Sequence, residues 1–113
     1  MSQLSAGARQ VFSEAQAGGA ILIVSHIVLA ELYFVLDKQR RPDLFDIFVA
    51  RLRATPAFRV EAVVLDDVLD LKNFTEIPEM HDRLIAVQAK QLGAKILTKD
   101  AHIRASTKVQ CVW

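Results

Sequence analysis

The chain has 113 residues, of which 52% are hydrophobic and 24% are charged, and it contains few glycines or prolines. This composition is typical of one compact globular domain spanning residues 1–113, and it excludes disordered and fibrous proteins. The formal net charge of +1 does not indicate a polyanion-binding surface, so any such surface must come from local clustering of the 14 Lys and Arg residues.

Membrane and disulfide-rich proteins are also disfavoured. The single cysteine, Cys111, cannot form an internal disulfide, and the opening residues MSQLSAGARQVF resemble neither a signal peptide nor a membrane span. The longest apolar stretch, residues 20–36, is interrupted by Ser25, His26 and Glu31, which argues against a membrane helix. We therefore expect a cytoplasmic protein.

The chain opens with a helical pattern that leads into a strand. Apolar residues recur at helical spacing from Leu4 to Ala15, and the pattern stops at Gly18-Gly19, which suits a helix C-cap. Residues 21–24 are a continuous apolar run, as expected for a buried strand of a parallel sheet.

Two more helices and a second strand are expected next. Ser25 can cap a helix whose apolar residues lie within 27–36, and Pro42 favours the start of another helix over residues 44–52. Apolar and charged residues then alternate from residue 58, and the pattern predicts a strand to residue 65 near the edge of a sheet.

The last third of the chain continues the alternation. Asp66 or Asp67 can cap a short helix, and Pro78 precedes a longer helix that ends at Gly93. A strand, a helical turn and a final strand are expected at residues 94–97, 101–106 and 109–112. Such alternation favours an α/β fold with a mainly parallel sheet between helices, in which ligands bind beyond the carboxyl ends of the strands.

Glu31 is the most informative carboxylate. Its neighbours three and four residues away on the expected helix are Ile27, Val28, Phe34 and Val35, none of which can neutralise it. A charge on an apolar helix face is costly unless it is paired, which implies a metal ion or another cation. The alternative is a Glu at the edge of the apolar face that reaches water.

Two further acids stand where α/β proteins often carry function. Asp82 begins a predicted helix, where an acid can also be a simple N-cap, and Asp100 follows a predicted strand but could cap the next turn. Glu79 is a weaker candidate and more typical of a solvated side chain. Separated carboxylates suit Mg²⁺ or Mn²⁺, whereas zinc fits poorly because the three histidines are far apart in the sequence.

Three segments together resemble the PIN domains of VapC-type bacterial toxins. They are VSHIVLAEL at residues 24–32, EIPEMHDRLI at residues 76–85 and LTKD at residues 97–100, and the two ends of the chain are similar too. The resemblance implies a parallel sheet between helices and a metal-dependent endoribonuclease. It also implies a homodimer held in check by an antitoxin protein.

The resemblance assigns roles to particular residues. Glu31, Asp82 and Asp100 would be the catalytic ligands of Mg²⁺ or Mn²⁺, and Ser25 and Thr98 would be supporting hydroxyls. A bound cation would lower the pKa of water and stabilise charge on the phosphoryl oxygens.

One feature of the family has no counterpart. PIN domains usually begin with a short apolar strand ending in Asp, ahead of the helix with which this chain opens. Because that strand is central in the family's sheet, we expect a gap between its neighbours and the loss of one metal ligand. A start codon placed too far downstream, or a degenerate toxin, would explain the difference.

Two alternatives to the ribonuclease remain. One is a catalytically impaired PIN-like module that binds RNA or an antitoxin without cutting. The other is a phosphatase or phosphotransfer domain, which the absence of an Asp-rich opening and Gly-rich loops disfavours. Arg40 and Arg41 belong to a basic stretch that could contact RNA phosphates, although such a stretch is more often a solvated face. The stretch consists of Lys38, Arg40, Arg41, Arg51, Arg53 and Arg59.

Overall fold

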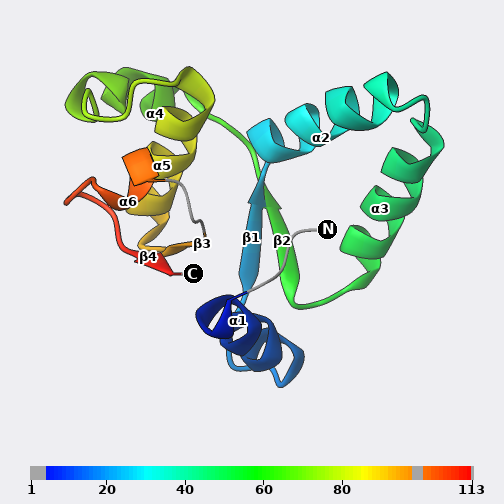
Figure 1. Ribbon diagram of the computed structural model, residues 1–113. Coiled ribbons are helices and arrows are strands. Elements are labelled where there is room, and N and C mark those ends of the chain that lie inside the picture. Colours follow the sequence, from blue (N-terminus) through cyan, green and yellow to red (C-terminus); the bar gives the residue numbers. More distant parts are fainter. Residues whose placement is uncertain (1–4, 98–100, 113) are drawn as a thin grey trace. The chain divides into compact units, whose positions relative to one another are not determined.

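The computed structural model describes residues 5–97 and 101–112 of the chain (Figure 1). The chain divides into two compact units. The central unit is Glu14–Ala62, and the terminal unit is Met1–Ser13 together with Val63–Trp113. Helix α1 (Ala6–Gln16) passes from the terminal unit into the central unit.

Both ends of helix α1 carry the local signals that its sequence suggests. The hydroxyl of Ser5 accepts a hydrogen bond of 3.1 Å from the backbone N–H of Ala8, which satisfies a donor that the first helical turn leaves unpaired. After the helix, Gly18 adopts a left-handed conformation with φ of 84°, and Gly19 donates its N–H to the carbonyl of Glu14 at 2.8 Å. The predicted stop at this glycine pair is therefore confirmed.

The central unit is built on two parallel strands. Strand β1 (Leu22–Ser25) pairs with β2 (Phe58–Glu61), and Ser25 lies opposite Glu61 at their carboxyl ends. A parallel pair needs a long crossover connection. Helices α2 (His26–Lys38) and α3 (Asp43–Ala54) provide it: α2 leaves the end of β1 and α3 returns the chain toward the start of β2 (Figure 1).

Helices α2 and α3 contact each other through aromatic side chains. The ring of Tyr33 on α2 meets that of Phe45 on α3 edge-on, with 5.4 Å between the ring centroids. Little else of α2 is covered, since none of its residues is buried and Phe34 is 63% exposed. Of the apolar face predicted for this helix, Val28 and Val35 are exposed, whereas Ile27, Leu32 and Leu36 are half-buried.

The second strand is shorter than predicted, and the reason is a helix cap. The alternating pattern suggested a strand to residue 65, but β2 ends at Glu61 and helix α4 (Leu65–Leu69) follows. The backbone N–H of Val64 donates to the carboxylate of Asp67 at 2.9 Å instead of joining a strand. The prediction that Asp66 or Asp67 caps this helix is confirmed for Asp67, although Val64 and not an aspartate occupies the N-cap position itself.

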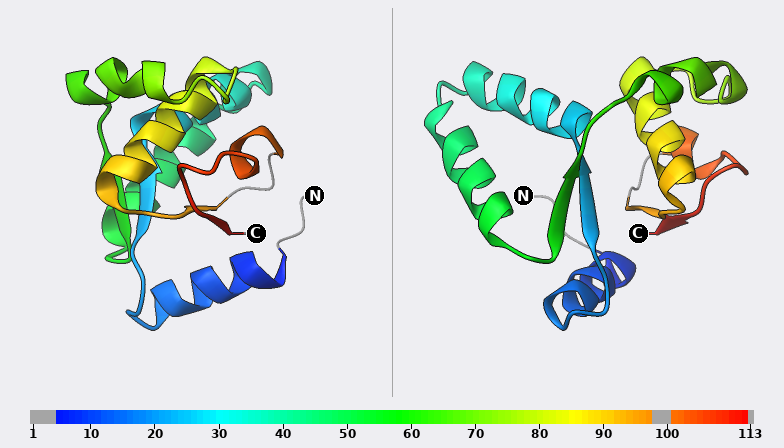
Figure 2. Two further views of the ribbon diagram at one scale, coloured as in Figure 1. Left: turned by 90° about the vertical axis from the view of Figure 1, so that its left-hand side faces the viewer. Right: turned by 180° about the vertical axis from the view of Figure 1, so that it is seen from behind.

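The terminal unit has the larger apolar core. Helix α5 (Met80–Leu92) lies against α4 and against the 3₁₀ helix η1 (Asp70–Asn73), and Figure 2 shows α5 beside η1 from two further sides. The core consists of apolar side chains from the loop between η1 and α5, from α5 itself, and from β3 and α6: Phe74, Ile77, Ala86, Val87, Ala89, Ile96 and Ile103. Burial of such side chains is the main force that holds this unit together.

Helix α5 ends in the way that its glycine predicts. Gly93 has φ of 65°, its N–H donates to the carbonyl of Lys90, and the N–H of Ala94 donates to the carbonyl of Ala89. This is the Schellman pattern of a helix C-terminus. Because Ala94 is part of the cap, strand β3 is shorter than the predicted residues 94–97 and covers only Ile96–Leu97.

The remaining elements complete a second parallel pair. Strand β3 pairs with β4 (Cys111–Val112), also shorter than predicted, and helix α6 (Ala101–Arg104) lies between them in the chain. The predicted α/β class is confirmed, and both strand pairs in the described part of the chain are parallel. They form two separate two-stranded sheets rather than one. None of the helices among the described residues is long and apolar enough to cross a membrane.

Candidate functional site

Ser25 is placed at the junction of a strand and a helix. It is the last residue of β1 and the N-cap of α2, with extended backbone angles, and its hydroxyl accepts a hydrogen bond of 3.1 Å from the backbone N–H of Ile27. Its side chain is buried. Ser25 therefore fixes where α2 begins relative to the carboxyl end of β1, which confirms the capping role expected from the sequence.

Glu31 lies on α2 and is exposed. The sequence suggested that its carboxylate would be costly on an apolar face, but in the structure this carboxylate reaches water. The burial argument for a nearby cation is therefore wrong, and the alternative environment that the sequence left open is the one observed. An exposed carboxylate can still bind a metal ion, so its role as a ligand stays a prediction.

Asp82 lies in the first turn of α5 and is half-buried. It is not the N-cap of this helix. Glu79 holds that position with extended backbone angles, and its Oε2 accepts a hydrogen bond of 2.8 Å from the backbone N–H of Asp82. An acid in a first turn is favoured by the partial positive charge of the helix N-terminus. Asp82 therefore lies at a position where acidic residues are common in helices.

Glu79 uses both of its carboxylate oxygens within the protein. While Oε2 binds the N–H of Asp82, Oε1 lies 2.6 Å from Nδ1 of His81. The hydrogen bond from Asp82, followed by that from His81, lowers the pKa of Glu79 below its ordinary value. Glu79 is exposed, as expected for a solvated side chain, but it also caps α5, a role that was not predicted from the sequence. The sequence signal that could have revealed this role is an acid directly after Pro78 and three residues before Asp82.

The predicted ligands lie in different parts of the chain. Glu31 belongs to the central unit and Asp82 to the terminal unit, while Thr98 and Asp100 lie outside the described residues. Within residues 5–97 and 101–112 there is no group of three His, Cys, Asp or Glu side chains that could hold a metal ion. Convergence of the three acids therefore stays a prediction.

The basic stretch is partly neutralised. The guanidinium of Arg41 donates two hydrogen bonds to the carboxylate of Asp43, at 3.1 and 3.0 Å, and both side chains are exposed. This contact raises the pKa of Arg41 and lowers that of Asp43. Arg40 adopts a left-handed backbone conformation with φ of 60° and is also exposed. Arg41 would thus have to exchange Asp43 for a phosphate in order to contact RNA.

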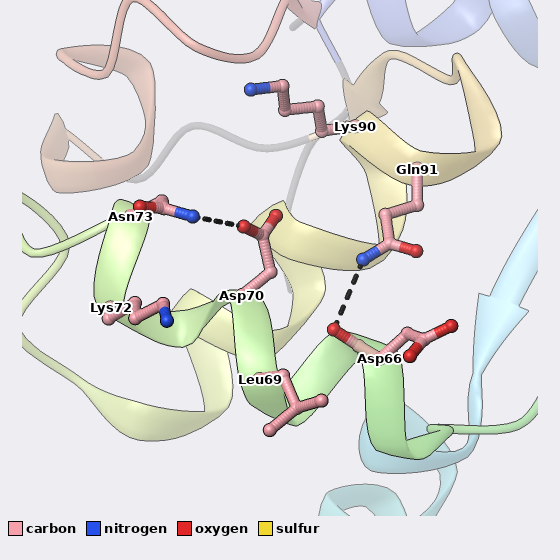
Figure 3. Close-up of a pocket in the computed structure, with 7 residues that line it drawn as sticks. All are labelled: Asp66, Leu69, Asp70, Lys72, Asn73, Lys90 and Gln91. Atoms are coloured by element: carbon pink, nitrogen blue, oxygen red, sulfur yellow. Dashed lines mark hydrogen bonds between the residues drawn. The ribbon is translucent and has the colours of Figure 1, made fainter.

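A pocket in the terminal unit was not expected from the sequence (Figure 3). It lies over α4, η1 and α5, and its walls carry Asp66, Asp70, Lys72 and Lys90. Asn73 donates a hydrogen bond to the carboxylate of Asp70, and Gln91 donates to the carbonyl of Asp66 at 3.4 Å. The two acids and two lysines give the pocket no dominant charge, and of the predicted metal ligands that the structure describes, neither Glu31 nor Asp82 lines it.

The comparison with known families decides the identity of the fold. Residues 4–108 match the PIN domain family, and this range spans residues of both units. The chain belongs to the PIN domain family. No curated protein and no solved structure gives a significant match to it. PIN domains are typically nucleases that use divalent metal ions and bind RNA, which makes nuclease chemistry the general expectation for this chain.

The predicted acids of this PIN domain are chemically suitable ligands for a divalent metal ion. The predicted set consists only of carboxylates, and carboxylate oxygens are the ligands that Mg²⁺ and Mn²⁺ prefer. Asp82 sits at a helix N-terminus and Glu31 is accessible from solvent.

Proposed function

We propose that this PIN domain is a metal-dependent endoribonuclease of the VapC toxin type, which hydrolyses RNA phosphodiester bonds. The observation that carries the proposal is the family match over residues 4–108, because this range contains all three predicted acids, Glu31, Asp82 and Asp100. Residues 1–113 would act as one domain in the cytoplasm.

Each proposed residue has a defined task. Glu31, Asp82 and Asp100 would bind Mg²⁺ or Mn²⁺ through their carboxylates, and Asp82 would do so from the first turn of α5. A bound divalent cation supplies Lewis acidity and lowers the pKa of water. Ser25 would act by fixing the start of the helix that carries Glu31, and Thr98 would add a hydroxyl near Asp100.

The proposed partners are an antitoxin protein and a second copy of this chain. Exposed apolar side chains on α2 and α3 support an interaction surface in the central unit, since contiguous apolar patches often mark protein interfaces. Phe34, Val35, Ile47 and Phe48 are the most accessible of them on these two helices, each more than two-fifths exposed. Arg40 and Arg41 would hold RNA by its phosphates rather than take part in the cleavage.

The test measures cleavage of an RNA pool by the 113-residue protein with Mg²⁺ or Mn²⁺, and with EDTA as a blank. We expect metal-dependent cleavage that Glu31→Gln and Asp82→Asn each abolish. Asp37→Asn is the matched control, because it removes a negative charge from another exposed acid of α2. Binding of RNA with no cleavage in any metal would instead favour a PIN module that binds without cutting.

A further inference from the structure

The start of helix α5 is fixed by an acid that is not one of the proposed metal ligands. Glu79 stands at the N-cap and accepts the backbone N–H of Asp82 at 2.8 Å, while the backbone N–H of Arg83 donates to the carbonyl of Glu79 at 2.9 Å. Both bonds close across a single turn, so the backbone of Asp82 is held directly by the residue three positions before it.

The other oxygen of Glu79 is also engaged. Nδ1 of His81 lies 2.6 Å from Oε1, and the His81 and Glu79 side chains are 39% and 50% exposed. A carboxylate with two partners on one helical turn has little rotational freedom, whereas a cap with a single partner can rotate. Both carboxylate oxygens of Glu79 therefore hold the first turn of α5 in place.

A second tie connects this turn to the apolar core. Nε of Arg83 donates a hydrogen bond of 2.6 Å to the carbonyl of Ile77, whose side chain is fully buried among the core residues. Ile77 in turn donates its N–H to the carbonyl of Phe74, another fully buried residue. The segment before α5 is thus anchored in the core. Glu79 belongs to this segment, and its hydrogen bond to the backbone N–H of Asp82 joins Asp82 to it.

We propose that Glu79 is a positioning residue for metal binding, which fixes the backbone of Asp82 so that its carboxylate is pre-arranged for a divalent cation. This inference rests on the proposed function, in which Asp82 is a metal ligand. Pre-arrangement matters because a ligand that is already ordered loses less conformational entropy when the cation binds. Outer residues that orient metal ligands typically change affinity by 10- to 100-fold when they are removed.

The experiment measures the affinity of the whole 113-residue protein for Mn²⁺, together with the hydrogen exchange rate of the Asp82 amide. Glu79→Ala should weaken Mn²⁺ binding by about 10-fold and accelerate exchange of that amide. Glu79→Asp should restore most of both, since Asp is a good N-cap residue.

Two control variants separate positioning from general loss of structure. Ser5→Ala removes a side chain that accepts a backbone N–H at the start of α1. If the loss of any helix cap weakened Mn²⁺ binding by lowering overall stability, this variant would show the same weakening. Glu76→Gln removes a charge from the same loop, where Glu76 is paired with Ser106 and Lys108 instead. Both controls should bind Mn²⁺ as the wild type does.

The outcomes separate the two proposals. Glu79→Gln replaces Glu79→Ala if the alanine variant does not fold. If the Glu79 variant binds Mn²⁺ as tightly as the wild type and Asp82→Asn binds it more weakly, Glu79 has no positioning role and the metal site stands. If Asp82→Asn also binds as tightly as the wild type, or if none of the proteins binds Mn²⁺, Asp82 is not a ligand and both proposals are overturned.

Discussion

The hydroxyl of Ser106 donates a hydrogen bond of 2.7 Å to Oε1 of Glu76, across thirty positions of the chain. The same Glu contacts Nζ of Lys108 at 3.4 Å through its other oxygen, and Nζ also donates to the carbonyl of Asn73. These contacts join the segment after α6 to the loop before α5. Ser106 is buried, so its hydroxyl depends on this partner rather than on water.

This pair predicts a pH dependence of stability. The hydrogen bond from Ser106, more than any other contact, lowers the pKa of Glu76 below its ordinary value. A depressed pKa means that folding favours the ionised form, so the stabilisation is present above the ordinary pKa of Glu, about 4.3. It is lost as the pH falls through the lower value of the folded state.

We therefore expect Ser106→Ala to lower the free energy of unfolding by about 1 kcal/mol at pH 7, with a smaller effect in acid. Urea unfolding of both proteins between pH 3 and pH 7 measures the difference. A gap between wild type and variant that stays constant with pH would show that the charge of Glu76 contributes nothing to the bond.

The core of the terminal unit depends on Phe74. This ring is fully buried, and Nζ of Lys90 and Nζ of Lys108 lie 5.4 and 5.3 Å from its centroid. Phe74→Ala should lower the free energy of unfolding by about 3–5 kcal/mol, because it removes a large apolar side chain and leaves a cavity. Phe34→Ala, at an exposed ring, should change it by no more than about 0.5 kcal/mol. Equal losses in a denaturant titration would contradict this assignment of the core.

Local signals in the sequence predicted helix ends better than strand ends. Ser25 and Gly93 act through their own side-chain or backbone chemistry, so their capping roles could be recognised without knowing what surrounds them. The end of β2 could not, because Val64 gives no sign that its N–H will bind the carboxylate of Asp67. The apolar residues after Glu61 therefore looked like more strand.

In the candidate site, too, local sequence signals predicted the place of a residue along its helix but not its surroundings. Asp82 was expected at a helix start, and it lies there. The exposure of Glu31 could not be predicted, because the spacing of apolar residues indicates which face they share but not what covers that face. The capping role of Glu79 was missed because Glu is not among the usual N-cap residues, and its second contact requires His81 to turn toward it.

Divalent metal should stabilise the protein if the three acids bind it. A ligand that binds only the folded state raises stability by about 2.7 kcal/mol at a concentration 100 times its dissociation constant. Mn²⁺ should therefore raise the melting temperature of the wild type, and Glu31→Gln or Asp82→Asn should remove most of the increase. Asp37→Asn should retain it. An increase of the same size in all four proteins would indicate binding elsewhere on the surface.

The contact between Arg41 and Asp43 predicts which change strengthens RNA binding. Asp43→Ala releases the guanidinium of Arg41, so RNA affinity at low salt should rise, whereas Arg40→Ala combined with Arg41→Ala should lower it. Removing each arginine that binds a phosphate should reduce the slope of log affinity against log salt by about 0.7 for single-stranded RNA. If both changes leave the affinity and slope of a labelled RNA unaltered, the basic stretch is a solvated face.

An added N-terminal strand tests the remaining part of the VapC proposal. Each strand of the described residues pairs with a single neighbour, so β1 and β3 both have backbone groups along one edge that another parallel strand could bind. Extending the protein before Met1 with a short apolar strand that ends in Asp should raise the melting temperature, tighten Mn²⁺ binding and increase RNA cleavage. Two control extensions separate the strand from its carboxylate. The same extension ending in Asn should give the gain in stability without the gain in metal affinity, because it keeps the strand and removes the carboxylate. A polar extension of equal length should give neither. If the Asn and Asp versions bind Mn²⁺ and cleave RNA alike, a fourth carboxylate has no part in the site, and three acids suffice.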